Sequence, residues 1–384
     1  MDALDEGMGL TVIARCADAL AEAHARIAHR FARAEARERA GRYLAGLLDR
    51  VERKNGWQLA EAIGESGPRG VQRLLSATTW DADGVRDDLR NYVVDRLGDE
   101  ATGVLIVDET GFLKKGSKSC GVARQYTGTA GDTVNCQVGV FLAYASARGA
   151  AFIDRALYLP QEWTRDHERR AEAGVPEETE FATKIELAQR LLARAFDATV
   201  PARWVVADAF YGRSHDLRRW LEACGYAYAL MIPKTNAVQY QERRERAEQL
   251  GDRLCPEPSF GPWTCLELSE ACAVGMRRWL LVRCDAEDPD EHTFFLAYGS
   301  EATAVEELIR VCTTRWQIEE CFAEAKGEVG LDHYEVRKWN AWHRHATLCL
   351  LAHAYLAIVS ASARRGAAET CQKGALLIIP SSSR

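Results

Sequence analysis

The stretch Val104-Leu105-Ile106-Val107-Asp108-Glu109-Thr110 decides the fold, because four branched apolar residues run together and then stop at a carboxylate. Gly103 precedes this run and Gly111 follows it. A continuous apolar run of this length is typical of a strand buried on both faces. We therefore expect Asp108 to lie at the carboxyl end of a buried strand, where ligands bind in open α/β sheets. The alternative is an aspartate that caps the following turn.

A second stretch, Trp204-Val205-Val206-Ala207-Asp208, repeats the pattern of an apolar strand that ends at an aspartate. A helix follows it, with Ser214 as the expected N-cap. Two carboxylates at the ends of strands in one sheet can bind a divalent metal ion. Mg²⁺ in particular takes oxygen ligands and keeps positions open for substrate phosphates.

A third acid, Glu319, lies in residues 305–329, which have the periodicity of one helix. Arg315, Glu319, Phe322 and Lys326 fall on one face of that helix. Such a face suits a helix laid over a metal site, with Glu319 reaching the metal while Arg315 and Lys326 meet phosphate. The alternative is Arg–Glu pairing on a solvated helix. The rival acids, should Glu319 be misplaced, are Glu320, Glu324 and Asp332.

Composition places the chain among globular proteins, with 384 residues, 47% apolar and 27% charged. We expect no membrane-spanning run, because no apolar stretch is long enough for one. We expect no signal peptide, because the first residues are acidic. The twelve cysteines form no C-x-x-C pair, so reduced cytosolic thiols are expected rather than structural zinc or disulfides. The net charge of −7 argues against a nucleic-acid partner, unless the charges are unevenly distributed.

The order of elements predicts an α/β fold with a helical N-terminal part. We expect helices over residues 19–51 and 57–63, another from Val71, and one capped by Asp81. The short helix, turn and helix resemble a helix-turn-helix, in which Arg69 and Arg73 would touch phosphate; a plain helical bundle is the alternative.

Strands are predicted over residues 121–127, 134–145, 151–157, 228–232, 263–268, 278–282 and 294–298. The helix expected over residues 181–195 makes a β-α-β crossover, and residues 241–252 read as a charged loop.

A basic loop follows the first strand and contains Lys114, Lys115 and Lys118. It is either a clamp on nucleic acid or a solvated turn. Trp316 is a candidate for stacking on a base turned out of a duplex, as are Trp339 and Trp342, with core packing as the alternative. His343 and His345 point to different faces of a helix, so we do not expect them to share a metal ion.

These blocks together resemble the DDE transposases of bacterial insertion sequences, in particular the branch numbered seven hundred and one. The resemblance is carried by residues 107–112, 208–212 and the pattern Arg315-x₃-Glu319-x₆-Lys326, and also by residues 52–61, 126–128 and 158–160. It covers residues 20 to 360. The related signature often has a tyrosine three residues before the arginine, where this chain has Cys312, and residues 366–384 do not look like the family's tail.

The resemblance implies an RNase H-like mixed sheet flanked by helices, with Asp108, Asp208 and Glu319 as the catalytic, metal-binding triad. It implies two Mg²⁺ or Mn²⁺ ions per site, and no organic cofactor is expected. Lys114, Lys115, Lys118, Arg315 and Lys326 are the expected DNA contacts. The implied organisation is a DNA-binding helical domain (1–100), the first part of the catalytic core (101–225), a β-rich insertion (226–302), the C-terminal core helices (303–365) and an atypical tail (366–384).

The function that this resemblance implies is metal-dependent cleavage at the ends of a mobile element and strand transfer into target DNA by cut-and-paste transposition. The partners would be the terminal inverted repeats, target DNA and a second copy of the chain, in the bacterial cytoplasm at the nucleoid and away from membranes. Two alternatives remain open. One is a DNA-binding protein derived from a transposase but inert or truncated; the other is a hydrolase that uses two carboxylates as acid and base.

Overall fold

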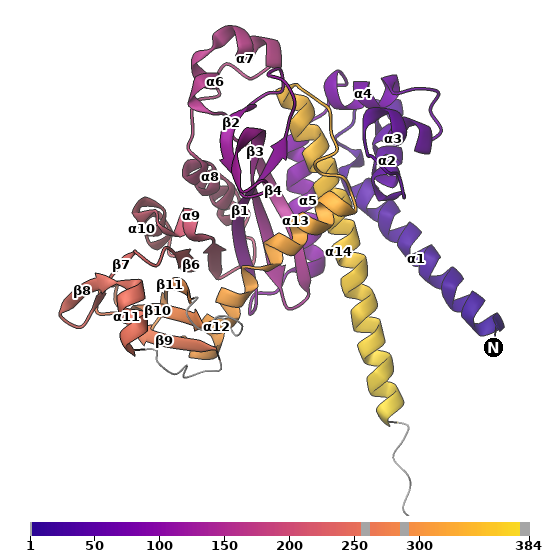
Figure 1. Cartoon of the computed structure of the whole chain (residues 1–384). Coiled ribbons are helices and arrows are strands. Elements are labelled where there is room, and N and C mark those ends of the chain that lie inside the picture. The colour runs from indigo at the N-terminus through magenta and orange to yellow at the C-terminus, as the bar shows by residue number, and fades with distance from the viewer. Residues whose placement is uncertain (1, 255–261, 285–291, 377–384) are drawn as a thin grey trace, which may run out of the picture.

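Within residues 2–254, 262–284 and 292–376, which the computed structural model describes, a nine-stranded mixed sheet forms the centre of the molecule (Figure 1). The strands run in the order β2-β3-β1-β5-β6-β11-β10-β9, and β4 pairs with β3 beside this path. Their bounds are β1 (Val104–Leu113), β2 (Ala123–Thr127), β3 (Asp132–Ser146), β4 (Gly149–Leu157), β5 (Trp204–Ala207), β6 (Ala227–Ile232), β9 (Trp263–Glu267), β10 (Met276–Cys284) and β11 (His292–Ser300).

The first strand, β1, is longer than the sequence predicts. Its apolar run from Val104 to Val107 is buried, as expected, but the strand continues past Asp108 to Leu113. The reason is that antiparallel pairing with β3 continues to the pair Leu113↔Cys136, whereas parallel pairing with β5 stops at Val107↔Ala207. Asp108 therefore lies where the parallel neighbour ends, and the predicted crossover between two parallel strands is confirmed.

Helices cover both faces of the sheet, as successive residues of β4 show. Asp154 accepts a hydrogen bond from Arg194 of α8 (Lys184–Asp197), at 2.8 Å. The next residue, Arg155, donates to Thr347 of α14 (Trp339–Leu376) at 2.9 Å and to Asp83 of α5 (Ala82–Leu97) at 2.8 Å. Because neighbouring residues of a strand point to opposite faces, α8 lies on one face and α5 and α14 lie on the other. The remaining short helices are α6 (Gln161–Arg165), α7 (His167–Ala173), α9 (Ala209–Gly212) and α10 (His215–Ala223).

The N-terminal part is helical, as predicted, but the single helix expected over residues 19–51 is wrong. The chain forms α1 (Asp2–Ala28) and α2 (Ala34–Leu48), followed by α3 (Gly56–Ala62) and α4 (Arg69–Ser76). The break lies at Phe31, which is buried and packs on Trp80 with ring centroids 5.0 Å apart. Arg33 then has an extended backbone, which starts α2 in a new direction. The predicted cap at Asp81 is confirmed, since its carboxylate accepts the N–H of Asp83.

The segment over residues 226–302 is rich in strands, as predicted, but most of them extend the central sheet. β6 pairs in parallel with β5, and β11, β10 and β9 follow in antiparallel order. The expected charged loop over residues 241–252 is wrong: β8 (Arg243–Arg246) pairs with β7 (Ala237–Tyr240), and α11 (Ala247–Leu254) follows. The main hydrophobic core runs from Ala23 to Ala361, and a second, smaller cluster lies within residues 232–296. The proposed division into domains stays a prediction.

The helix predicted over residues 305–329 is interrupted. α12 (Val305–Thr314) ends and α13 (Gln317–Gly327) begins on either side of Arg315 and Trp316. At this junction the N–H groups of Arg315 and Trp316 bond to the carbonyl oxygens three residues earlier, which tightens the last turn. Phe322 is buried in the core, whereas the side chain of Glu319 is 52% exposed, so the common face of Arg315, Glu319, Phe322 and Lys326 stays a prediction.

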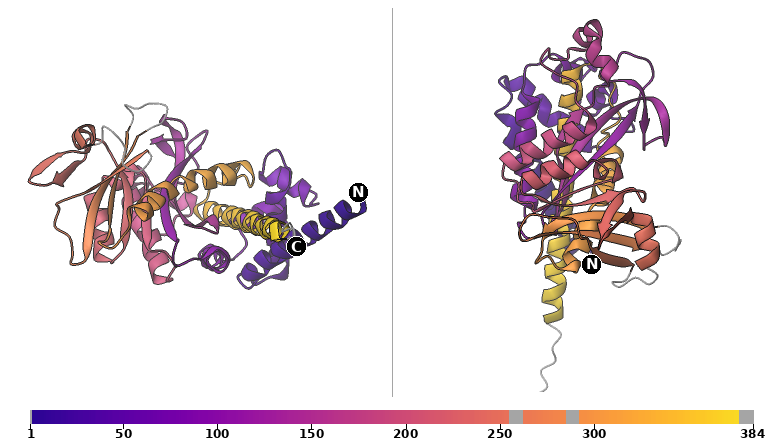
Figure 2. Two further views of the ribbon diagram at one scale, coloured as in Figure 1. Left: turned by 90° about the horizontal axis from the view of Figure 1, so that it is seen from below. Right: turned by 90° about the vertical axis from the view of Figure 1, so that its left-hand side faces the viewer.

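The helix α14 is the longest element and crosses the whole molecule, and Figure 2 shows its last turns and the start of α1 extending beyond the sheet. In the described part of the chain, its stretch Trp339–Arg365 alone is long and apolar enough to span a membrane, with mean hydropathy 1.7. No such run was expected from the sequence. Because 67% of that window is buried inside the protein, packing against β4 and α5 accounts for its apolar composition. Of the atypical tail, residues 377–384 lie outside the described residues.

Candidate active site

Asp108 and Asp208 lie side by side, because each follows one of the paired residues Val107 and Ala207 on adjacent parallel strands. The structure thus brings together the two aspartates that the sequence analysis singled out. Burial, and then the neighbouring Asp208 carboxylate, raise the pKa of Asp108 to about 8. Burial also raises the pKa of Asp208, and the carboxylate of Glu109 raises it further. Two buried carboxylates that repel each other form a site that a cation stabilises.

The local sequence fixes the direction of Asp208. Its Oδ1 accepts the N–H of Phe210 at 2.9 Å and that of Tyr211 at 3.3 Å, so the aspartate is the N-cap of α9. Gly212 ends this helix against β6, where an added Cβ would lie 1.7 Å from the carbonyl oxygen of Met231. Only glycine allows α9 to come this close to the sheet. The predicted N-cap at Ser214 is also confirmed, since its hydroxyl accepts the N–H of Leu217.

Glu109 is a third carboxylate near the aspartates, and the sequence analysis gave it no role. Its charge raises the pKa of both Asp108 and Asp208. Its Oε1 accepts a hydrogen bond from Lys184 Nζ of α8 at 2.8 Å, while its Oε2 is buried without a hydrogen-bond partner in the described part of the protein. The only signal in the sequence was its position directly after Asp108.

Glu319 is held by Arg315 at the junction of α12 and α13. The Nη2 of Arg315 donates to Oε1 of Glu319 at 2.6 Å. Arg315 itself is only 3% exposed, and its positive charge opposes the upward shift of the pKa of both aspartates. The guanidinium group therefore lies near the aspartate pair and connects it to Glu319. Across residues 2–254, 262–284 and 292–376, no three His, Cys, Asp or Glu side chains form a group that could hold a metal ion, so the convergence of all three acids stays a prediction.

The rival acids of the sequence analysis lie elsewhere. Glu320 and Glu324 line a hollow between α13 and α14, where Glu324 lies 3.2 Å from His353. Asp332 is 3.9 Å from His333, and its charge opposes the burial that lowers the pKa of Lys326. Among the acids near the end of the chain, Glu319 alone is hydrogen-bonded to Arg315 within the described residues.

The aspartate pair fits a hard divalent cation. Carboxylate oxygens are the ligands that Mg²⁺ and Mn²⁺ prefer, and Asp108 and Asp208 present them from adjacent strands. The buried Oε2 of Glu109, which lacks a hydrogen-bond partner among the described residues, adds an acceptor beside them. The chemistry of these carboxylates fits such an ion, although within the described residues no three of them form a metal-holding group.

The predicted basic contacts differ in their surroundings. Lys326 donates to the hydroxyl of Thr110 at 2.7 Å, two residues beyond Asp108, and burial lowers its pKa. Lys114 donates to the carbonyl oxygen of Tyr334 at 3.0 Å and burial lowers its pKa to about 8. Lys118 is exposed and pairs with Glu172 at 2.8 Å, and Lys115 is exposed. Lys326 is thus the lysine of this set placed beside the aspartates.

The aromatic, histidine and cysteine residues that the sequence singled out differ in their contacts. The ring of Trp316 lies 3.8 Å from the guanidinium carbon of Arg315, a cation–π contact. Trp342 and Cys312 are buried in the core. His345 is buried too, and its ring accepts or donates a hydrogen bond with Tyr43 at 2.8 Å. Base stacking by Trp316 stays a prediction.

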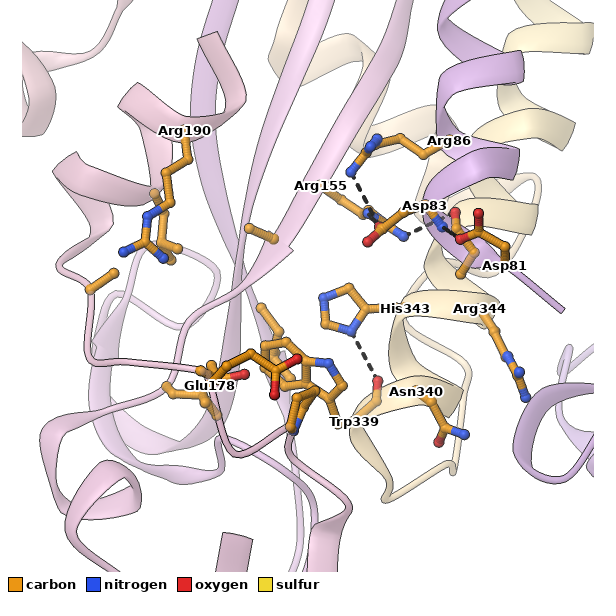
Figure 3. A pocket seen from close by; sticks show the side chains of 18 of the residues that line it. Asp81, Asp83, Arg86, Arg155, Glu178, Arg190, Trp339, Asn340, His343 and Arg344 are labelled. Atoms are coloured by element: carbon orange, nitrogen blue, oxygen red, sulfur yellow. Dashed lines mark hydrogen bonds and ion pairs between the residues drawn. The ribbon is translucent and has the colours of Figure 1, made fainter. Parts of the chain in front are cut away.

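A separate cavity of 560 Å³ lies between the start of α5, the end of β4, α8 and the start of α14 (Figure 3). Two of its arginines are paired with Asp83: Arg155 at 2.8 Å and Arg86 at 3.2 Å. Arg344 donates to the carbonyl oxygens of Leu75 and Trp80 instead. Arg190, which also lines the cavity, is exposed and has no ion pair within the described residues. Neither Asp108 nor Asp208 lines this cavity.

Comparison with known proteins places the chain in a family. The family model described as DDE superfamily endonuclease matches residues 26–279. The probable transposase for insertion sequence element IS701 of Microchaete diplosiphon is 26% identical over 303 residues, which is 75% of each chain. Among solved structures, the piggyBac transposase synaptic complex with hairpin DNA aligns with a TM-score of 0.44 and 12% identity, covering 78% of this chain and 59% of that one. Endonuclease V of Ciona intestinalis, bound to inosine-containing DNA, aligns with a TM-score of 0.28 and 9% identity over 63% of this chain and 96% of that one. Because the family match spans most of the chain, this protein belongs to the DDE superfamily endonucleases.

Proposed function

We propose that this protein is a DNA transposase that cleaves DNA strands at the ends of an insertion element and joins them to target DNA. The observation that carries the proposal is the pair Asp108 and Asp208 on adjacent parallel strands, each half-buried at the end of the paired stretch. The family match and the likeness to the insertion-sequence transposase support the same reading.

The core of this proposal is an RNase H-like fold. It is supported by the three parallel strands β1, β5 and β6 and by the antiparallel strand β3 beside β1. Both aspartates follow parallel strands of this core, at the edge of the sheet where ligands bind in α/β proteins.

In the proposed site, Asp108 and Asp208 hold Mg²⁺ or Mn²⁺, two ions per site, with Glu319 as the third ligand. When bound, such ions lower the pKa of water and stabilise the leaving oxygen of a phosphodiester. Arg315 and Lys326 supply positive charge beside the reacting phosphate. The side chain of Glu319 is half-exposed near the junction of α12 and α13. The proposal requires that rotation about its bonds bring its carboxylate toward the aspartates.

The proposed reaction needs no covalent link between protein and DNA. Water attacks the phosphodiester at the element's end and frees a 3′ hydroxyl. That hydroxyl then attacks a phosphodiester of the target, so one strand bond forms as another breaks. The proposed partners are the terminal inverted repeats and target DNA, bound by two copies of the chain at the bacterial nucleoid.

The test is metal-dependent nicking of a duplex that carries the inverted repeats flanking the gene. We expect cleavage with Mg²⁺ or Mn²⁺ and none with EDTA. Asp108→Asn and Asp208→Asn should each lower the rate by more than about 1,000-fold, because each removes a ligand of the site. The matched control is Asp216→Asn, whose carboxylate is 86% exposed on α10. Cleavage that survives EDTA or Asp108→Asn would refute the proposal.

One observation favours a second candidate, a DNA-binding protein that has lost catalysis. Glu319 is hydrogen-bonded to Arg315 and does not form one metal-holding group with the aspartates in the described structure. For such a protein, DNA binding would be unchanged by Asp108→Asn, and neither metal ion would produce cleavage. The same nicking assay therefore separates the two candidates.

A further inference from the structure

A basic hollow lies beside α10, on the side of the molecule that carries the hairpin of β7 and β8 (Figure 1). Its volume is 480 Å³, and small-molecule sites usually measure about 300–1,000 Å³. Two glutamates and four arginines contribute to its lining. The arginines are Arg218 and Arg219 of α10, Arg244 of β8 and Arg278 of β10. We call this cavity the α10 hollow. Neither Asp108 nor Asp208 lines it.

The two glutamates of the α10 hollow are already paired with one of its arginines. Arg278 donates to Glu222 at 2.6 Å and to Glu270 at 2.5 Å. Glu222 also accepts a hydrogen bond from the hydroxyl of Tyr228 at 2.7 Å. Because Arg278 holds both carboxylates, the other arginines of the hollow form no ion pair with either of them in the described part of the chain.

Arg218 is buried in the wall of the hollow without a carboxylate partner. The residue is 5% exposed, and within the described residues no Asp or Glu pairs with it. Its Nη1 donates to the carbonyl oxygen of Gly212 at 2.9 Å, and its Nη2 donates to Nδ1 of His215 at 2.9 Å. A guanidinium group has five N–H donors, so three of them have no partner among the described residues. A buried cation without a counter-charge is costly, and an anion in the hollow would remove that cost.

Two exposed arginines bring further positive charge to the same place. Arg244 forms neither an ion pair nor a side-chain hydrogen bond within the described residues, and Arg219 pairs with the exposed Asp216 at 3.0 Å. The charge of Arg218, then burial, and then the charges of the other two arginines lower the pKa of His215. Because one ring is affected by all three guanidinium groups, the three converge at the first turn of α10. The N-terminal end of a helix itself favours an anion.

The donors of the α10 hollow suit a phosphate group. Guanidinium groups bind phosphate through paired N–H donors. Among the described residues that line the hollow there is no Phe, Tyr or Trp on which a base could stack. Recognition therefore depends on charge. A terminal phosphate carries a charge of about −1.5 to −2 at pH 7 and three oxygens free to accept, whereas a phosphodiester carries one negative charge.

We propose that the α10 hollow binds a terminal phosphate group, either that of a small phosphorylated molecule or that at the 5′ end of a DNA strand. The buried Arg218 meets the phosphate inside the hollow, and Arg219 and Arg244 meet it from α10 and β8. This inference goes beyond the proposed function, because it involves neither a metal ion nor the two aspartates.

A single short helix joins this hollow to Asp208. Arg218 donates to the carbonyl oxygen of Gly212, the last residue of α9, and Asp208 caps the other end of the same helix. A phosphate on Arg218 adds a contact to the residues that hold α9 in place. Since a ligand that binds the folded chain stabilises it, we expect phosphate to raise the melting temperature.

The experiment is isothermal titration calorimetry of the full chain with inorganic phosphate, near neutral pH and at an ionic strength of about 0.15 M. We expect saturable binding and a melting temperature that rises with phosphate concentration. Arg244→Ala should weaken binding about tenfold and Arg218→Gln about 100-fold, because each removes a charged hydrogen-bond partner. Dimethyl phosphate has one negative charge and two blocked oxygens, so it should bind about tenfold more weakly than inorganic phosphate.

The matched control is Arg243→Ala, next to Arg244 on β8. Neighbouring residues of a strand point to opposite faces, and Arg243 is equally exposed but does not line the hollow. Arg243→Ala should bind phosphate within about twofold of wild type. Arg244→Ala changes an exposed side chain, so it tests the proposal even if Arg218→Gln fails to fold. The proposal is overturned if wild type shows no saturable binding, if Arg244→Ala binds like wild type, if Arg243→Ala loses as much affinity, or if dimethyl phosphate binds as tightly as phosphate.

Two further ligands distinguish the sources of the phosphate. AMP is compared with adenosine, and a single-stranded oligonucleotide with a 5′ phosphate is compared with the same strand ending in a 5′ hydroxyl. A gain in affinity that depends on the phosphate, and that Arg244→Ala removes, identifies the source and supports the proposal; no gain for either ligand overturns it. None of these measurements involves cleavage. A chain that binds phosphate but does not cleave DNA refutes the proposed function alone, and a chain that cleaves but binds no phosphate refutes this inference alone.

Discussion

Arg315 donates from Nη2 to Oε1 of Glu319 at 2.6 Å, and this hydrogen bond connects the third acid of the site to the two aspartates. The guanidinium group is nearly fully buried under the ring of Trp316, whereas the carboxylate it holds is 52% exposed. Arg315 thus lies between the exposed Glu319 and the pair Asp108 and Asp208. Its charge offsets part of the repulsion in that pair.

From this relationship we predict that Arg315→Ala lowers the rate of metal-dependent cleavage by about 100-fold. This is the effect expected when one positioned hydrogen-bond donor beside the reacting group is removed. It removes the positive charge beside the aspartates and releases Glu319. Arg315→Lys should recover part of the rate, because the charge stays but the planar stacking on Trp316 is lost. The measurement is single-turnover cleavage, with DNA binding followed in parallel.

The control for Arg315 is Arg310→Ala on α12. Arg310 pairs with Glu307 at 2.7 Å and donates to the carbonyl oxygen of Thr102, at the other end of β1. Its loss should leave the cleavage rate within a few-fold of wild type. Wild-type cleavage by a folded Arg315→Ala chain would show that the arginine has no part in the reaction.

The strands and the aspartate pair could be predicted from sequence because their causes are local. The run Val104 to Val107 and the run before Asp208 are continuously apolar, and a strand buried on both faces needs that pattern. Caps such as Asp81 and Ser214 were predictable for the same reason, since a cap bonds to backbone two or three residues away.

The breaks within helices could not be predicted from periodicity alone. The apolar pattern continues through Arg315 and Trp316, and the interruption comes from bonds to the carbonyl oxygens three residues earlier together with the burial of Arg315. The break at Phe31 likewise depends on Trp80, which is distant in sequence. Two adjoining hollows over α2 and α4 show the same limit: Arg69 and Arg73 drew attention as one helix face, but Arg33, Arg39 and Arg42 join them only through folding.

A second prediction concerns Gly212, where α9 contacts β6. Gly212→Ala should lower the free energy of unfolding by about 1–3 kcal/mol, because the added Cβ would lie 1.7 Å from the carbonyl oxygen of Met231. Relief of this clash moves α9 and therefore its cap, Asp208. We expect the cleavage rate of the fully folded variant to fall by more than its loss of unfolding free energy explains. Cleavage kinetics on folded protein measure the first quantity, and urea denaturation measures the second.

The comparison variant is Gly327→Ala at the end of α13, where no neighbouring atom lies within 4 Å of the added Cβ. This change should be neutral or stabilise by up to about 1 kcal/mol, the difference in helix propensity between the two residues. If Gly212→Ala proves as stable and active as wild type, the close approach of α9 to β6 is not what fixes Asp208.

The third prediction is a loss of stability at mildly acidic pH caused by His345. This ring is 1% exposed, and burial lowers its pKa to about 3. The unfolded chain binds a proton at this histidine near pH 6.5, whereas the folded chain does not. Its neighbours, Tyr43 at 2.8 Å, Cys349 at 3.4 Å and the more distant Lys114, provide no negative charge that favours protonation. Above pH 6.5 both states are neutral here, so the unfavourable contribution grows only as the pH falls from about 6.5 toward 3.

The size of this effect follows from linkage: between pH 8 and pH 5 it amounts to about 2 kcal/mol of unfolding free energy. His345→Gln cannot titrate, so its stability should fall about 2 kcal/mol less than that of wild type over the same interval, whatever its stability at pH 8. His167→Gln, at an exposed ring on α7, serves as the control and should follow the wild-type curve. Urea denaturation at half-unit pH steps measures the unfolding free energy of each variant as a function of pH. If these curves run parallel for wild type and His345→Gln, protonation of the buried ring does not destabilise the folded chain and the prediction is wrong.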